Sequence, residues 1–149
     1  MAYGFNDDKS KFNFGDWARL IHKTSGKMRG DIYYKVTDDG EVTLKFNLAL
    51  SSEVSAGTVE TLVALNSLPT AIKPKGTSAG GLGLYMQSPM YMMSQNNKME
   101  QNNATSAMRC AFAISKSGLA IRLFDAITST MMMANDFYIH SEWKYNTGI

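Results

Sequence analysis

The sequence predicts an all-β protein, an antiparallel β-sandwich of about seven or eight strands with a jelly-roll-like arrangement. Several short segments alternate apolar and polar side chains, and turns that contain glycine separate them. In contrast, no window of a dozen residues shows the 3.6-residue apolar spacing of an amphipathic helix. With 149 residues, of which 44% are hydrophobic, the chain has the length of one domain and enough apolar side chains for one core.

The clearest element is a hairpin in residues 31–50. Apolar and polar residues alternate with a period of two on both sides of the turn at Asp38–Gly40. The apolar set is Ile32, Tyr34 and Val36 on the first strand and Val42, Leu44, Phe46 and Leu48 on the second. Because successive side chains of a strand point to opposite faces, we expect one buried face and one face in water.

A second hairpin is predicted in residues 108–123. Its turn is Ser115–Gly118, and its apolar rows are Met108, Cys110, Phe112 and Ile114, then Leu119, Ile121 and Leu123. Cys110 lies in the first row, so we predict a small buried side chain and no reactive thiol. As the single cysteine of the chain, it also excludes an internal disulfide.

The remaining expected strands are Trp17–Lys23, Thr58–Leu65, Gly80–Met86 and Asp136–Tyr145. In the last of these, Phe137, Ile139, Trp143 and Tyr145 share one face. Residues 16–22 leave an alternative open, a short helix capped by Asp16. The glycines at 80–83 are not followed by the Gly-Lys-Ser/Thr of a phosphate-binding loop, and they indicate a bend or a close backbone approach in a strand.

Residues 1–16 are predicted to be an N-terminal arm, and residues 17–149 a single β-sandwich head domain. The arm mixes glycines and polar residues with Tyr3, Phe5, Phe12 and Phe14, which suits either a segment that lies against another surface or a frayed terminus. Residues 94–105 are polar and rich in Asn and Gln, so we expect a long exposed connection between strands there.

Charge and hydropathy exclude several classes of partner. The net charge of +2 and the charged fraction of 19% argue against binding to nucleic acid. No run of about 18 apolar residues is present, so we expect no membrane insertion. The N-terminal residues lack the apolar run of a signal peptide, and we therefore expect the chain to be made in a cytoplasm.

Residue patterns for catalysis or cofactor binding are missing from the sequence. Neither His22 nor His140 belongs to an HxxxH or HExxH spacing, and no CxxC or GxSxG occurs. The aspartate pairs lie at turns, where hydration explains them. We interpret the methionine clusters at 86–99 and 131–133 as core or subunit-contact residues and not as soft-metal ligands. We expect no metal, no cofactor and no enzymatic activity.

The stretch ALNSLPTAIKP, residues 64–74, interrupts the series of strands with two prolines. Proline cannot donate to a sheet ladder and holds the residue before it in extended geometry. Leu68 and Lys73 are therefore expected to be extended residues at a corner where the chain leaves one sheet. Leu68 and Ile72 are predicted to be buried in this corner, while Lys73 stays in water.

This corner and the elements around it carry a family resemblance. Their order resembles the C-terminal head of phage tail fibre and baseplate receptor-binding proteins over residues 17–146. Gly26 and Lys27, beside residues 32–34, resemble the strand that opens such heads, whereas residues 71–73 depart from the family pattern before the second proline. The other matching residues are Leu68, Pro69 and Pro74 in the loop, and Gly118, Leu119 and Ile121 in the second hairpin.

The resemblance implies a viral protein that is part of a phage or prophage tail and has no enzymatic activity. Such heads are commonly homotrimers, in which threefold symmetry adds avidity to weak single sites. It further implies synthesis in the bacterial cytoplasm, assembly into the virion tail, and host attachment through a saccharide or other polymer of the bacterial surface. The N-terminal arm would contact other tail proteins.

Aromatic and imidazole side chains that combine an apolar face with a polar edge suit contact with sugars. We therefore expect ligand contacts from Tyr91, Tyr138, His140 and Trp143. A free-standing carbohydrate-binding or lectin-like module is the alternative function, and it would bind as a monomer. A hydrolase would need two convergent carboxylates, for which the candidates are Glu53, Glu60, Glu100, Asp125 and Glu142.

Overall fold

The computed structural model describes residues 5–6, 16–74, 84–96 and 106–147, which form nine strands in one hydrogen-bonded sheet. The strand order is β1-β2-β3-β4-β9-β6-β7-β8-β5, and every pair is antiparallel except β1 with β2. The strands are β1 (Phe5–Asn6), β2 (Trp17–Lys23), β3 (Met28–Val36), β4 (Glu41–Leu50), β5 (Thr58–Ala64), β6 (Leu84–Asn96), β7 (Ser106–Ser115), β8 (Gly118–Leu123) and β9 (Asn135–Asn146).

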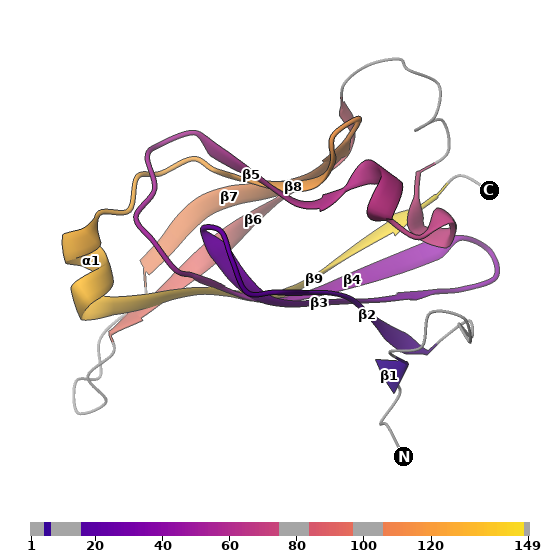
Figure 1. The fold of residues 1–149 in the computed structure, drawn as a ribbon, viewed down its shortest axis with the longest axis horizontal. Coiled ribbons are helices and arrows are strands. Elements are labelled where there is room, and N and C mark those ends of the chain that lie inside the picture. Colours follow the sequence, from indigo (N-terminus) through magenta and orange to yellow (C-terminus); the bar gives the residue numbers. More distant parts are fainter. Residues whose placement is uncertain (1–4, 7–15, 75–83, 97–105, 148–149) are drawn as a thin grey trace.

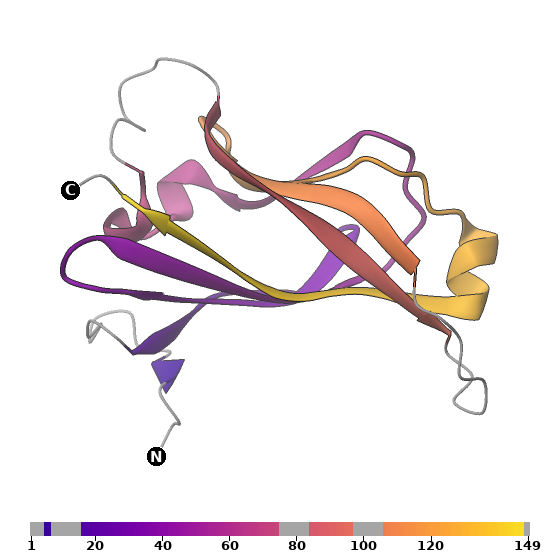
Figure 2. The same cartoon turned by 180° about the vertical axis from the view of Figure 1, so that it is seen from behind.

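The sheet folds onto itself into two layers (Figure 1). The first layer contains β1, β2, β3, β4 and β9, and the second contains β6, β7, β8 and β5 (Figure 2). They are joined because β9 pairs with β4 along most of its length, whereas its first residues pair with the end of β6, from Met93↔Tyr138 to Asn96↔Asn135. The predicted antiparallel β-sandwich is confirmed.

Connections between neighbouring strands explain the strand order. β2, β3 and β4 form a meander, as do β6, β7 and β8. β9 then returns to lie beside β6, so that the order β9-β6-β7-β8 is a Greek key.

The core lies between the layers and is built by the predicted alternation. In the first hairpin, all seven residues of the apolar set are buried, with exposed fractions of 2% or less. The rings of Phe46 on β4 and Phe112 on β7 stack across the two layers, with centroids 3.8 Å apart. Burial of a side chain of this size contributes about 1.5–3 kcal/mol, so such pairs hold the layers together.

The second hairpin is also confirmed, with Cys110, Phe112, Ile114, Leu119, Ile121 and Leu123 buried. Gly118 begins β8 with φ +113°, a conformation that other residues rarely adopt. A side chain there would meet the backbone of β5 around Val63 and Leu65. The tight turn therefore lets β8 pair with β7 on one side and with β5 on the other.

Residues 17–23 form a strand, β2, and not the alternative helix. Ala18 and Leu20 are buried, whereas Trp17 and Arg19 are only partly buried, which is the two-residue period of a half-buried strand. The register shifts between Arg19 and Ile21, so β2 contains a bulge.

β6 is longer than the sequence predicted. It continues through Pro89 to Asn96, so the predicted end at Met86 and the predicted start of the connection at Ser94 are both wrong. Around Pro89 the strand pairs with β7 alone, and an edge of this kind tolerates a residue that has no N–H to donate. The part of the predicted strand at 80–83 and the rest of the connection at 97–105 lie outside the described residues.

A short helix, α1 (Ser129–Ala134), was not predicted and contains the second methionine cluster. The Thr128 hydroxyl accepts a hydrogen bond from the Met131 N–H at 3.2 Å, as a helix cap does. Met131 and Met132 pack partly against the core, while Met133 is 81% exposed. In the part of the chain that the structure describes, no helix is long and apolar enough to cross a membrane.

The loop with the two prolines contains two 3₁₀ turns, η2 (Leu65–Ser67) and η3 (Thr70–Ile72). Leu68 and Ile72 are buried and Lys73 is partly exposed, so the predicted corner with two buried apolar side chains is confirmed. The Tyr145 hydroxyl, near the end of β9, donates a hydrogen bond of 2.6 Å to the Ile72 carbonyl. The loop therefore packs against the end of β9 that lies away from β6.

Candidate functional site

The outer face of the first layer carries the candidate site. Here the register of β2, β3, β4 and β9 aligns the mostly polar, outward-facing residues of each strand into rows that run across the sheet. The rows are Lys35, Thr43 and Lys144; Arg19, Tyr33, Lys45 and Glu142; His22, Asp31, Asn47 and His140; and Arg29, Ala49 and Tyr138. These are the residues that the alternation of each strand turns away from the core.

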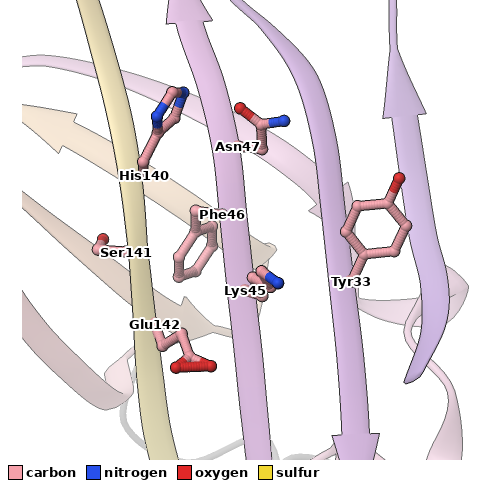
Figure 3. A pocket seen from close by; sticks show the side chains of 7 residues that line it. All are labelled: Tyr33, Lys45, Phe46, Asn47, His140, Ser141 and Glu142. Atoms are coloured by element: carbon pink, nitrogen blue, oxygen red, sulfur yellow. The ribbon is translucent and has the colours of Figure 1, made fainter. Parts of the chain in front are cut away.

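A hollow of about 680 Å³ lies on this face across β3, β4 and β9 (Figure 3). We call it the β3-β4-β9 hollow. Its lining residues are Tyr33, Lys45, Phe46, Asn47, His140, Ser141 and Glu142. Phe46 belongs to the core and is 1% exposed, so the polar contacts of the hollow come from the outward rows.

The chemistry of the hollow is mixed. Tyr33 provides an aromatic ring and a hydroxyl, and Asn47 provides an amide that both donates and accepts hydrogen bonds. Lys45 and Glu142 face each other across β4 and β9 and add one cation and one carboxylate. Sugars combine apolar ring faces with hydroxyls that donate and accept, so this set of groups suits a saccharide.

His140 and Tyr138 lie next to each other on the outward side of β9. Their ring centroids are 4.8 Å apart and the ring planes are tilted by 44°. His140 lines the β3-β4-β9 hollow, so the structure brings together two of the four residues that the sequence suggested as ligand contacts.

The other two suggested residues do not join them. Trp143 is 6% exposed and lies on the inner side of β9, where its ring is 5.0 Å from that of Tyr145. Because a strand alternates, a residue three positions after His140 faces the opposite side, and the suggestion for Trp143 is therefore corrected. Tyr91 lies on β6 in the second layer, paired with Arg109, and its side chain is outside the part that the structure describes.

Sequence reasoning missed Tyr33, Lys45 and Asn47 as lining residues. The sequence did show them as the polar row of the first hairpin, the face expected in water. What it did not show is that β9, about ninety residues later in the chain, pairs with β4 and completes the hollow. The available signal was the polar face of the first hairpin together with a predicted last strand whose pairing partner was not known.

Trp17 extends the aromatic character of this face. The Lys35 ammonium group lies 4.8 Å from the centroid of the Trp17 ring, and that of Lys45 lies 5.2 Å from it. Cation–π contacts of this kind contribute about 0.5–1 kcal/mol each at exposed sites. Lys45 thus belongs both to the β3-β4-β9 hollow and to the group around Trp17.

Two of the candidate carboxylates, Glu60 and Asp125, make hydrogen bonds within the protein. The Glu60 side chain on β5 accepts hydrogen bonds from the backbone N–H groups of Lys27 at 2.7 Å and Met28 at 2.9 Å. Asp125 accepts hydrogen bonds from the backbone and the guanidinium of Arg109, which lowers the pKa of Asp125. Glu100 lies outside the described residues.

Metal and thiol chemistry find no support in the described part of the chain. No group of three or more His, Cys, Asp or Glu side chains there could hold a metal ion. Cys110 is 1% exposed, as predicted, and burial raises the pKa of its thiol to about 12. A thiol with such a pKa stays protonated at neutral pH and is a poor nucleophile.

Further hollows lie elsewhere on the molecule. One of about 570 Å³ is bordered by Lys27, Glu53 and residues 126–128, and one of about 370 Å³ by Pro89, Met90, Arg109, Cys110 and Phe124. The second is mostly apolar and includes the partly exposed Phe124. Neither contains the combination of aromatic, amide and charged groups found in the β3-β4-β9 hollow.

Comparisons with models of protein families, with curated proteins and with solved structures gave no match to this chain.

Proposed function

We propose that the protein is a non-enzymatic binding module that holds a saccharide or related polymer in the β3-β4-β9 hollow. The observation that carries this proposal is the meeting of Tyr33, Lys45, Asn47, His140 and Glu142 in one open hollow of about 680 Å³. Polar groups that converge around an aromatic ring are what a sugar-binding surface requires. An open hollow on the outer face of a sheet suits a long polymer better than a small enclosed ligand.

The biological setting that we propose is a phage or prophage tail, where the protein would be a fibre or baseplate component of the virion. Its ligand would be a polymer of the bacterial surface, and the N-terminal arm would contact other tail proteins. This part of the proposal is supported by the sequence resemblance in the proline loop and the second hairpin. We also propose a homotrimer, in which three weak sites would act together.

A free-standing carbohydrate-binding module is a second candidate function, and one observation favours it. The hollow is formed by three neighbouring strands of the sheet, β3, β4 and β9. A monomer would therefore present the whole site. Binding that persists with unchanged affinity in a stable monomer would favour this candidate over the trimeric tail protein.

The test is binding of purified surface polysaccharides by the wild-type protein and by Asn47→Ala and His140→Ala variants. Both side chains are exposed, so the variants should fold, which circular dichroism would check. We expect each variant to weaken binding by about tenfold, the cost of losing a hydrogen bond to a polar ligand. Calorimetric titration measures the affinity.

Thr61→Ala is the matched control, because Thr61 is an exposed polar residue of β5 in the second layer. It should bind like the wild-type protein. If Asn47→Ala and His140→Ala bind a polysaccharide as tightly as the wild-type protein does, the β3-β4-β9 hollow is not the site and the proposal fails. The same holds if no bacterial surface polysaccharide binds at all.

A further inference from the structure

Two lysines share one aromatic ring on the outer face of the first layer. Trp17, Lys35 and Lys45 come from β2, β3 and β4, and both ammonium nitrogens lie within 5.2 Å of the centre of the Trp17 ring. Lys35 and Lys45 occupy diagonal positions on neighbouring strands, since Lys35 pairs with Thr43 and Lys45 pairs with Tyr33. Two like charges thus lie around one ring on the outer face of the sheet, and each repels the other.

Among the residues that the structure describes, no ion pair joins Lys35 or Lys45 to a carboxylate. Glu142 lies opposite Lys45 across β4 and β9, yet no ion pair joins them in the part of the chain that the structure describes. Asp31 is paired with His22 at 2.6 Å, in the next row of the sheet. The Lys45 side chain is therefore directed toward Trp17, although a carboxylate stands at the neighbouring position.

The surroundings add further positive charge. Lys144 lies in the same row as Lys35, with Thr43 between them. The two rows at this end of the face therefore hold three lysines, Lys35, Lys45 and Lys144, and one carboxylate, Glu142. An anion beside Trp17 would be attracted by several of these groups at once and would relieve the repulsion between Lys35 and Lys45.

We propose that Trp17, Lys35 and Lys45 form an anion-binding site that takes the carboxylate or phosphate groups of an acidic saccharide polymer. This inference rests on the proposed function, because Lys45 also lines the β3-β4-β9 hollow. A polymer that places one sugar in the hollow would present its next anionic substituent to the ammonium groups, and the Trp17 ring would contact a sugar face.

A saccharide polymer fits this surface better than a nucleic acid does. The whole chain carries a net charge of only +2, and Lys35, Lys45 and Lys144 form a small group beside a hollow for a polar ligand. Nucleic-acid binding relies on many phosphate contacts along a basic stripe. Single-stranded DNA is therefore included in the test as a competitor.

The experiment compares polygalacturonate with its fully methyl-esterified form, which has the same sugar backbone without the charge. Poly(glycerol phosphate) serves as the phosphate arm. Binding is followed at low salt through the indole N–H signals in a ¹H–¹⁵N correlation spectrum. Trp17 and Trp143 are the two tryptophans, and Trp143, at 6% exposure, serves as the buried reference.

We expect the acidic polymers to shift the Trp17 signal and leave the Trp143 signal in place, with at least tenfold tighter binding than the ester. The double variant Lys35→Gln/Lys45→Gln should lose this preference for the acid. The control variant Lys116→Gln/Arg122→Gln removes two exposed cations of the second layer and should keep the preference. Salt should weaken binding of the acid more than binding of the ester.

The outcomes separate this inference from the proposed function. Equal binding of acid and ester through the hollow would overturn the anion site and leave the proposed function standing. If the control variant also loses its preference for the acidic polymer, the anion site is overturned as well, because the preference would then depend only on the overall charge of the protein. Single-stranded DNA that binds as tightly, with the same dependence on the two lysines, would assign the site to nucleic acid instead. No shift of the Trp17 signal with any anion would also overturn it.

Discussion

Single side chains connect loops to strands at the ends of this sandwich, and Tyr145 is the clearest case. Its hydroxyl donates to the Ile72 carbonyl at 2.6 Å and so ties β9 to the proline loop. Burial raises the pKa of Tyr145, because an ionised phenolate would lose both hydration and the proton of this hydrogen bond. The folded chain therefore depends on the neutral form of this residue.

We expect Tyr145→Phe to lower the free energy of unfolding by about 1–3 kcal/mol at pH 7, because the Ile72 carbonyl would lose its partner. A raised pKa means that this stabilisation is complete below the ordinary tyrosine pKa of about 10 and is lost as the pH rises above it. The difference between the variant and the wild type should therefore shrink above about pH 10.

Urea denaturation across this pH range makes the measurement. Tyr138→Phe is the control, since Tyr138 lies on the outward side of β9, and it should leave stability nearly unchanged. A Tyr145→Phe protein as stable as the wild type at pH 7 would contradict the role of the hydrogen bond.

Asp125 gives a prediction of the opposite sign. Hydrogen bonds from the side chain and backbone of Arg109 lower its pKa, so its contribution is present above the ordinary aspartate pKa and is lost as the pH falls below it. We expect Asp125→Asn to lower the melting temperature at pH 7 by no more than a few degrees, because the pair is exposed. The difference should vanish by about pH 2.

Differential scanning calorimetry at several pH values measures this effect. Asp38→Asn, at the exposed turn of the first hairpin, is the control and should show no such loss. A difference for Asp125→Asn that stays constant from pH 7 to pH 2 would show that the charge of Asp125 is not the cause.

At the scale of elements, turns and corners decide which strands can meet. Gly118 lets β8 pass between β7 and β5, because its backbone lies close to that of Val63 and Leu65. The proline loop begins where β5 ends, beside Gly118, and covers the same end of the core with Leu68 and Ile72. Each feature depends on one conformation that few residues can adopt.

We predict that Gly118→Ala destabilises the fold by about 3 kcal/mol or more. A Cβ atom at Gly118 would lie 2.6 Å from the Leu65 nitrogen, in addition to the strain of φ +113°. Gly57→Ala is the matched control: Gly57 has φ +83° but nothing within 4 Å of the added atom. It should cost only about 1–2 kcal/mol.

Guanidinium denaturation of both variants measures the difference. Equal losses for the two variants would show that the close approach of β5 does not matter and that backbone conformation alone explains the effect.

For the proline loop we predict a loss of stability without a loss of binding. Pro69→Ala/Pro74→Ala should lower the free energy of unfolding by about 1–2 kcal/mol, since each proline restricts the unfolded chain. Affinity for a bound polysaccharide should not change, because neither proline lines the β3-β4-β9 hollow. An unchanged melting temperature together with lost binding would show that the loop contributes to binding and not to stability.

On the scale of the whole molecule, the outward surfaces of the two layers differ. The first layer carries charged and aromatic rows, whereas the outward residues of the second include Thr61, Ala113, Ala120 and Arg122. Under the proposed function, a ligand with many polar groups would bind to the rows of the first layer.

The proposed homotrimer leads to a prediction for the molecule in solution. Light scattering coupled to size exclusion should give about three times the 16.5 kDa of one chain, with little change on dilution. A mass of one chain at all concentrations would remove the trimer from the proposal and favour the free-standing module.

Local sequence patterns were enough to predict both hairpins, the buried faces of their strands and the corner at the prolines. These features follow from local rules, since a period of two, a glycine turn and an X-Pro bond act within a few residues. The sequence also showed that Phe137, Ile139, Trp143 and Tyr145 share a face, which already separated Trp143 from His140. The helix α1 and the full length of β6 were not predicted, because neither segment has a clear apolar period.

The neighbours of each strand, in contrast, depend on the packing of the whole chain. β9 pairs with β4 from Glu41↔Asn146 to Ala49↔Tyr138, and this pairing creates the β3-β4-β9 hollow and places His140 beside Asn47. The group of Trp17 with Lys35 and Lys45 likewise needs three strands in register. Pairing between distant strands depends on how both layers pack over a common core, and no local pattern specifies that choice.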